Sequence, residues 1–201
     1  QIRYYDAKSD EILRKEQDRD YDGNLDAWQS YEEGRIARRE LDTNGDGRPD
    51  VWERYRNDRM TARELDRDHD GTRDAFYRFE GDSIVEERHD ADNDGSMDLV
   101  VRYRDRLRVS AQEDRDRDGR VDSWTTYRHV AGAEQVERIE RDTDGDGRPD
   151  LFETYEVIEG RSVLARREED KNGDGQIDVT SIYENGKLVR REISDPALVP
   201  L

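Results

Sequence analysis

The chain has 201 residues, of which 44% are charged and 31% hydrophobic, and its formal net charge is −18. A thick apolar core is not expected, because so little apolar surface cannot offset the entropy cost of ordering the chain. The negative charge argues against nucleic acid as a partner. No apolar run is long enough to form a transmembrane segment. The lack of cysteine excludes disulfides and thiolate metal sites.

The first residues match the last part of a repeat, since Tyr5, Ile12 and Glu16 fit the spacing that recurs after each later loop. Seven nine-residue loops follow, with the sequences DRDYDGNLD, DTNGDGRPD, DRDHDGTRD, DADNDGSMD, DRDRDGRVD, DTDGDGRPD and DKNGDGQID. Asp stands at positions 1, 5 and 9 and Gly at position 6 in every copy. Such repetition predicts a repeat protein. We expect residues 1–193 to form one array of eight hairpin units joined by seven loops, and residues 194–201 to form a C-terminal tail.

Each segment between two loops is predicted to form a β-hairpin. Its centre carries a turn dipeptide, such as Asn57-Asp58 or Asn185-Gly186, and two longer repeats are expected to lengthen this central turn. The stretch AWQSYEEGRIARREL also suits a helix, which would give EF-hand-like or dockerin-like helical repeats, but the turn dipeptides favour hairpins. The predicted fold class is all-β, an extended antiparallel meander of repeated β-hairpins joined by the Asp-rich loops. The pattern leaves open whether the sheet is single-layered or curled into a closed shape.

The strand register can be predicted from the aromatic residues that recur after each loop. Pairing Tyr31 with Ile36 across the first complete turn places Trp28 opposite Arg39, which predicts a cation–π contact. The same register predicts two further contacts of this kind, Trp52 with Arg63 and Phe152 with Arg167.

The loops have the chemistry of a calcium site. Side chains at positions 1, 3, 5 and 9 and the backbone carbonyl of position 7 offer only hard oxygen ligands, which select calcium over softer metals. The loops hold 26 of the 53 acidic residues, so seven calcium ions would reduce the net charge from −18 to −4. The predicted metal-site residues are Asp18, Asp20, Asp22, Asn24, Asp26, Asp42, Asn44, Asp46, Arg48, Asp50, Asp66, Asp68, Asp70, Thr72, Asp74, Asp90, Asp92, Asp94, Ser96, Asp98, Asp114, Asp116, Asp118, Arg120, Asp122, Asp142, Asp144, Asp146, Arg148, Asp150, Asp170, Asn172, Asp174, Gln176 and Asp178.

The form DxDxDGxxD resembles the calcium loops of integrin-α-type repeats, thrombospondin type 3 repeats and EF-hands, and IYENGKLV resembles a MORN-type hairpin repeat. Together these features resemble a bacterial-type calcium-binding repeat protein, which implies Ca²⁺ at about seven sites. An EF-hand loop also needs a bidentate Glu at position 12. Only Glu53 and Glu153 stand at that position here, so water is expected to complete the remaining sites.

The first functional expectation is a calcium-stabilised scaffold protein, with a structural, adhesive or interaction role. It would be secreted or anchored in an extracellular, periplasmic or cell-surface location, where millimolar calcium suits loops of this class, and its partner would be another protein or a surface component. The alternative is a calcium buffer or sensor. No enzyme is expected, because His69, His89 and His129 lie far apart in the sequence and no nucleophile–base motif surrounds them.

Overall fold

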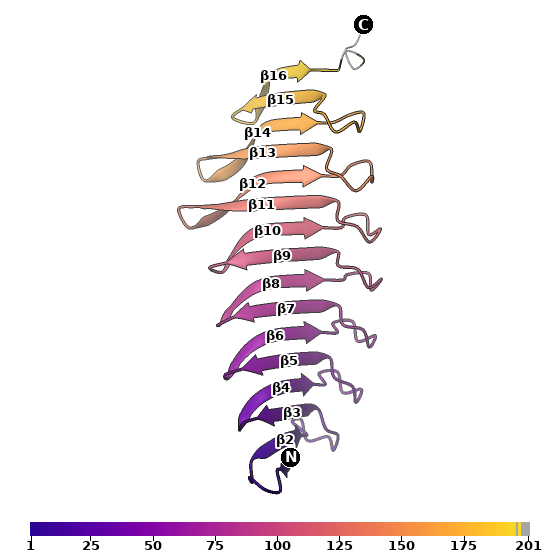
Figure 1. Ribbon diagram of the computed structural model, residues 1–201, viewed down its shortest axis with the longest axis vertical. Helices are drawn as coiled ribbons and strands as arrows, with labels where there is room; N and C mark the ends of the chain where they lie inside the picture. Colours follow the sequence, from indigo (N-terminus) through magenta and orange to yellow (C-terminus); the bar gives the residue numbers. More distant parts are fainter. Residues whose placement is uncertain (196, 198–201) are drawn as a thin grey trace. The chain divides into compact units, whose positions relative to one another are not determined.

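The computed structural model describes residues 1–195 and 197, and these residues form an all-β chain (Figure 1). Sixteen antiparallel strands form an open meander in which the strand order is the chain order. The predicted fold class is therefore confirmed. The helical alternative is wrong, because each Asp-rich loop leaves one strand and enters the next. The described residues contain no helix long and apolar enough to cross a membrane. Most of the predicted tail, residues 196 and 198–201, lies outside the described residues.

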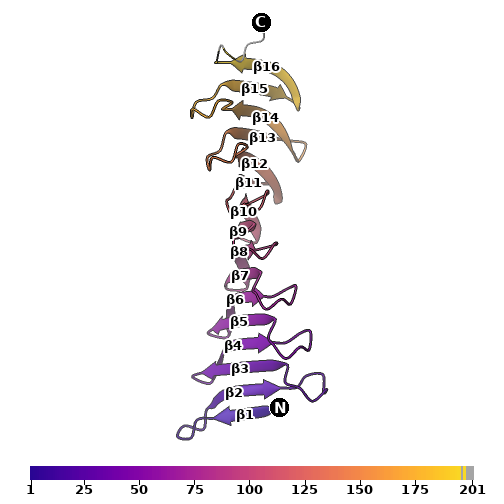
Figure 2. The same ribbon diagram turned by 90° about the vertical axis from the view of Figure 1, so that its right-hand side faces the viewer.

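The chain divides into two compact units, Gln1–Gly95 and Ser96–Leu201. In the first unit, tight turns lie along one edge of the sheet and the long Asp-rich loops along the other (Figures 1 and 2). Its strands are β1 (Ile2–Tyr5), β2 (Ile12–Gln17), β3 (Ala27–Glu32), β4 (Arg35–Leu41), β5 (Val51–Arg56), β6 (Arg59–Leu65), β7 (Ala75–Glu80) and β8 (Ser83–His89).

The second unit repeats this arrangement with eight further strands, and its Asp-rich loops again share one edge (Figure 1). Its strands are β9 (Leu99–Arg104), β10 (Leu107–Glu113), β11 (Ser123–Val130), β12 (Ala133–Arg141), β13 (Leu151–Ile158), β14 (Arg161–Glu169), β15 (Val179–Glu184) and β16 (Lys187–Ile193).

The hairpin turns have the left-handed backbone that two-residue hairpins need. Asn57 and Asp58 have φ values of 52° and 61°, and Asn185 and Gly186 have 51° and 75°. Positive φ at both central residues matches the right-handed twist of the flanking strands. These turn residues explain why the segments fold locally as hairpins.

The two longer repeats differ from the expectation of a longer turn. Their turns still contain only two residues, for instance Ala131-Gly132, while β11 and β12 have eight and nine residues. The four extra residues of each repeat therefore extend the two strands. An even extension keeps every side chain on its original face of the sheet, because side chains alternate with a period of two.

A β-bulge in each hairpin overturns the predicted aromatic–arginine register. Tyr31 does pair with Ile36, but the register shifts between Ser30 and Tyr31, so that Trp28 pairs with Glu40. The extra residue on the second strand moves every later pair by one position. The other two predicted pairs are wrong for the same reason, because Trp52 pairs with Glu64 and Phe152 with Glu168.

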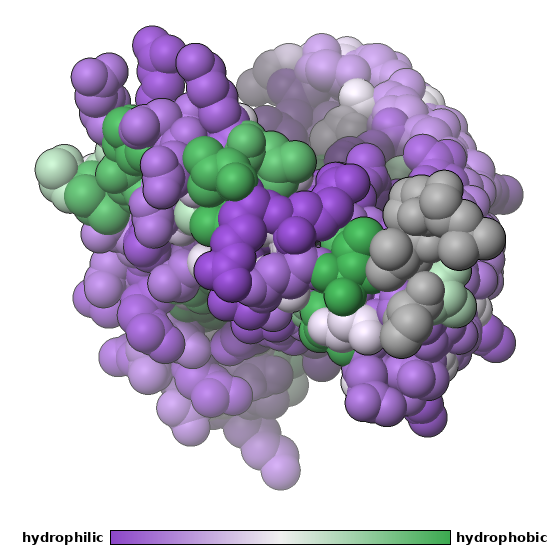
Figure 3. Space-filling model, turned by 90° about the horizontal axis from the view of Figure 1, so that it is seen from above, coloured by the Kyte–Doolittle hydropathy of each residue, from purple (hydrophilic) through white to green (hydrophobic). Residues whose placement is uncertain are grey.

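The core is thin, as the composition predicts. The buried hydrophobic side chains are small and few, and most stand at the start of a strand beside an Asp-rich loop: Ala27, Val51, Ala75, Val101, Ala111, Leu151 and Val179. In the view of Figure 3 most of the visible surface is hydrophilic, and hydrophobic residues form separate patches. Buried acidic residues of the loops, including Asp50 and Asp74, outnumber large apolar residues in the interior.

Candidate metal sites

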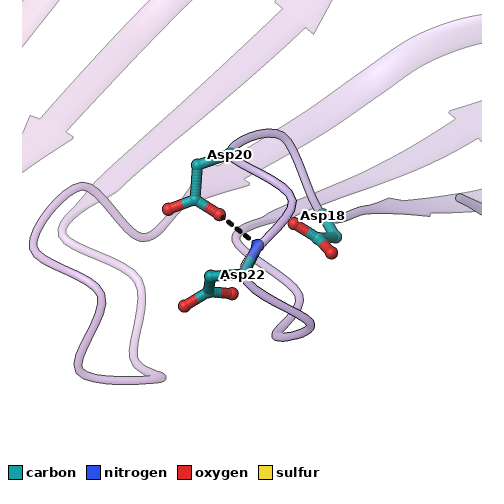
Figure 4. A group of neighbouring side chains, drawn as sticks. All are labelled: Asp18, Asp20 and Asp22. Carbon is teal, nitrogen blue, oxygen red and sulfur yellow. Dashed lines mark hydrogen bonds between the residues drawn. The ribbon is translucent and has the colours of Figure 1, made fainter.

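The carboxylate at position 1 accepts hydrogen bonds from backbone N–H groups later in the loop, so that the loop bends around it. In the first loop, Asp18 accepts hydrogen bonds from the backbone N–H groups of Tyr21 at 2.7 Å and Gly23 at 3.1 Å. The residue at position 3 then accepts from the N–H of position 5, as Asp20 does from Asp22 at 3.2 Å (Figure 4). All seven loops share this second bond. The aspartates and asparagines thus fold the backbone through short local bonds of the Asx-turn type.

The carboxylate at position 9 closes the loop. Asp26 accepts the N–H of Arg19 at 2.7 Å, and its own N–H donates to the carbonyl of Gln17 at 2.9 Å. The equivalent aspartates Asp50 and Asp74 are each only 3% exposed. The loop closure brings the last predicted ligand back beside the first.

Sequence reasoning missed the special role of position 4. This residue has a positive φ in all seven loops, from 62° at Asn93 and Arg117 to 78° at Gly145. The glycine at position 6 has a positive φ as well, for instance 99° at Gly23, and it permits the second reversal of the chain. Glycine or asparagine at position 4 of four loops was the signal that could have revealed this requirement.

Within the two units, four loops bring three carboxylates together, with one oxygen atom of each lying within 4.8 Å of the others. Three of these clusters use positions 1, 3 and 5, whereas the fifth loop uses positions 1, 3 and 9. The clusters are Asp18, Asp20 and Asp22; Asp66, Asp68 and Asp70; Asp114, Asp116 and Asp122; and Asp142, Asp144 and Asp146. The second and seventh loops carry Asn44 and Asn172 at position 3, whose amide oxygens are also hard ligands. The fourth loop contributes Asp90 and Asp92 to the first unit and Asp98 to the second.

The third loop provides the clearest test of whether a cation fits. Asp66 is only 4% exposed, and its Oδ2 accepts the N–H of Gly71 at 2.9 Å. Its Oδ1 is buried and has no hydrogen-bond partner in the described structure. A buried carboxylate oxygen without a partner is costly unless a cation balances it. The donor set and this oxygen together fit a hard divalent cation.

Local hydrogen bonds favour the ionised form of several loop carboxylates. The backbone N–H of Asn24 lowers the pKa of Asp22, and the side-chain amide of Asn93 lowers the pKa of Asp68. Burial raises the pKa of Asp142, but the N–H groups of Gly147 and Gly145 more than reverse this effect, so its pKa is also lowered. Anionic oxygen is the form that binds calcium.

The two glutamates at position 12 form hydrogen bonds with tyrosine and arginine side chains of the sheet. Glu53 is 2% exposed, and its Oε2 accepts hydrogen bonds from Arg39 Nε at 2.7 Å and from Tyr55 Oη at 2.6 Å. Tyr155 donates to Glu153 in the same way at 3.0 Å. These bonds disfavour the expectation that the two glutamates complete a metal site, because their carboxylates bind side chains of the sheet.

The position-7 residues form backbone hydrogen bonds through their N–H groups. Six of them donate to the carboxylate at position 5, such as Arg48 to Asp46 at 2.8 Å. This bond fixes the peptide whose carbonyl was predicted to bind the metal. The ligand role of that carbonyl stays a prediction.

Neighbouring loops are joined to one another. The N–H of Asp42 donates to the carbonyl of Asp26 at 2.9 Å, and the same bond recurs between the first and ninth positions of successive loops. Position 4 adds side-chain contacts in the first unit. His69 Nδ1 lies 2.9 Å from Asp50 Oδ1, and Asn93 Nδ2 donates to Asp68 Oδ2 at 2.5 Å. A change in one loop is therefore transmitted directly to the next.

No family model matches the chain, and no curated protein matches it.

Proposed function

We propose that this chain is a calcium-stabilised repeat protein in which metal sites replace the missing apolar core. The observation that carries this proposal is the buried, unpartnered Oδ1 of Asp66, which lies within 4.8 Å of oxygen atoms of Asp68 and Asp70. Bringing three carboxylates together disfavours folding unless a cation is bound. Metal binding would then contribute directly to the free energy of folding.

Calcium is favoured over other divalent ions by the ligand chemistry. Every predicted side-chain ligand is a carboxylate or amide oxygen, whereas structural zinc sites use mainly cysteine sulfur and histidine nitrogen. The predicted ligands of each nine-residue loop are side chains at positions 1, 3, 5 and 9 and one backbone carbonyl, a set that calcium accepts more readily than Mg²⁺, which demands near-ideal octahedral geometry. Sites of this class in extracellular modules have dissociation constants of about 10⁻⁴–10⁻³ M. We accordingly propose about seven calcium ions and a location outside the cytoplasm, where calcium is millimolar.

The proposed role is that of a scaffold with structural, adhesive or interaction functions. The loops of each unit stand along one edge of its sheet and are joined by hydrogen bonds, so calcium would hold successive hairpins in a fixed relation. A sensor would instead expose new apolar surface on binding calcium. The small buried residues of this chain offer little such surface, which supports the scaffold over the sensor.

Calorimetry and circular dichroism would test the proposal. Titration of the chelated protein with calcium should give about seven bound ions and a gain of β-strand signal, and magnesium at the same concentration should give a much smaller effect. A dye that brightens on apolar surface should lose signal when calcium is added. A count near zero in millimolar calcium would refute the calcium proposal, whereas a rise in dye signal at constant strand content would favour the sensor.

A further inference from the structure

In the first unit, the guanidinium group of a loop arginine stacks on a tryptophan of the sheet. Arg73, at position 8 of the third loop, lies over the indole ring of Trp52 at 4.2 Å from its centroid. The same guanidinium contacts Oε2 of Glu64, which pairs with Trp52 across β5 and β6. Oε1 of Glu64 binds Arg54 at 2.5 Å. Trp52 and Glu64 thus form a socket for a planar cation, held by stacking and by an ion pair.

The first unit contains a second socket with the same tryptophan–glutamate pairing but with no arginine over its indole. Trp28 pairs with Glu40 across β3 and β4, as Trp52 does with Glu64. Position 8 of the adjoining loop is Pro49, and proline has no group that can cover the indole. Among the described residues no guanidinium lies over Trp28. Ser30 stands where Arg54 stands in the occupied socket, and its partner Arg38 stands where Ala62 does. An open pocket of about 250 Å³ lies beside Trp28, and Arg14 and Arg38 line it together with Ser30 and Glu40.

The second unit repeats this open socket. Trp124 pairs with Glu140 across β11 and β12, and position 8 of the adjoining loop is again proline, Pro149. Thr126 leaves the same hollow, and the pocket beside Trp124 also measures about 250 Å³. Arg138 Nε binds Oε1 of Glu140 at 2.8 Å, as Arg54 binds Oε1 of Glu64. Within the described residues, the other carboxylate oxygen of Glu140, which corresponds to the one that Arg73 contacts in Glu64, accepts no hydrogen bond and forms no ion pair.

We propose that the sockets at Trp28 and Trp124 bind arginine side chains of a basic partner protein. The occupied socket at Trp52 shows which group the geometry accepts, namely a guanidinium that stacks on the indole and pairs with the opposing glutamate. Arginine is preferred to lysine because its planar group can stack and donate at the same time. The net charge of −18 attracts such a partner, and it remains negative even with seven calcium ions bound.

The three tryptophans allow a direct test by NMR, because each indole N–H gives one resonance. The full chain in saturating calcium is titrated with the peptide acetyl-Gly-Arg-Gly-amide. The indole resonances of Trp28 and Trp124 should shift with the peptide, and that of Trp52 should not, because Arg73 already covers it. The same peptide with citrulline, which keeps the shape and lacks the charge, is the matched control and should cause no shift.

Two substitutions exchange the open and occupied states. Arg73→Ala should open the third socket, so that Trp52 begins to respond to the peptide. Pro49→Arg should close the first socket from within, so that Trp28 stops responding while Trp124 still does. Glu40→Gln should weaken the response of Trp28 about fivefold, since an exposed ion pair is lost. Neither position 8 nor Glu40 is a predicted metal ligand, so the calcium count should stay unchanged in all three variants.

The proposal is overturned if the arginine peptide leaves Trp28 and Trp124 unshifted in the folded protein, if citrulline acts equally well, or if Trp52 responds to the same extent before Arg73 is removed. Strand content measured with and without calcium in the same samples keeps this test separate from the calcium proposal. A protein that folds without calcium but binds arginine at both tryptophans would support the sockets and refute the calcium requirement.

Discussion

Replacing Asp66 by asparagine should stabilise the protein clearly without calcium and much less with it. Without metal, the substitution removes one charge from a cluster whose oxygen atoms lie within 4.8 Å of one another. At that distance, each pair of carboxylates repels by about 1 kcal/mol in water and by about 3.5 kcal/mol at an effective dielectric constant of about 20. Asp68 and Asp70 are exposed, so the lower value applies to both pairs. Asp66→Asn should therefore stabilise the metal-free protein by about 2 kcal/mol.

With calcium, the same substitution removes a ligand and should weaken or abolish one site. A site with a dissociation constant of about 10⁻⁴ M contributes about 1.4 kcal/mol of stability at 1 mM calcium. Loss of this contribution should cancel most of the gain of about 2 kcal/mol that the substitution gives the metal-free protein. Asp66→Asn should thus change the stability in 1 mM calcium by less than about 1 kcal/mol and reduce the calorimetric ion count by one.

Urea unfolding in calcium and in chelator measures both effects, and Asp82→Asn is the matched control because Asp82 is an exposed residue of a hairpin turn. The control should leave both midpoints unchanged. An equal shift for Asp66→Asn in calcium and in chelator would refute the reasoning that metal compensates the buried charge.

Other perturbations distinguish the sheet from the loops. Glu53→Gln should destabilise the protein by about 3 kcal/mol, because it breaks a buried ion-pair network. Calorimetry should still count the same number of bound ions. Loss of one ion would show that Glu53 is a metal ligand. Burial and the hydrogen bonds to their glutamate neighbours raise the pKa of Tyr55 and Tyr155 to about 12. The stability that these phenols contribute should be complete below their ordinary pKa of about 10 and should be lost as the pH rises through about 12. Absorbance at alkaline pH should show that these two tyrosines titrate late. Titration of all ten tyrosines together would contradict this prediction. Asp118→Ala should change the fluorescence of the nearby Trp124 but not that of the two tryptophans of the first unit, because coupling in repeat arrays passes between neighbours. An equal change at all three tryptophans would refute nearest-neighbour coupling.

The sequence alone determined the loops and the strand order of the hairpins. Asp at positions 1, 5 and 9 with Gly at position 6 identified the candidate sites, because local hydrogen bonds and one glycine backbone are enough to shape the loop. Turn dipeptides such as Asn185-Gly186 identified the hairpins for the same reason. Both features depend on residues close together in the chain, so a reading of short segments could find them.

The tertiary structure decided the features that depend on pairing across strands. One bulge per hairpin changed the partner of Trp28 from Arg39 to Glu40, and sequence periodicity could not reveal it because an extra residue on one strand leaves the pattern of each strand intact. Glu53 stands at the twelfth position of a calcium-loop pattern, yet its side chain binds Arg39 from the preceding strand. Whether an indole is covered depends on a residue that reaches it from a neighbouring loop, as Arg73 reaches Trp52. Local propensity sets the loop and the turn, whereas register and side-chain partners are fixed only when separate strands come together.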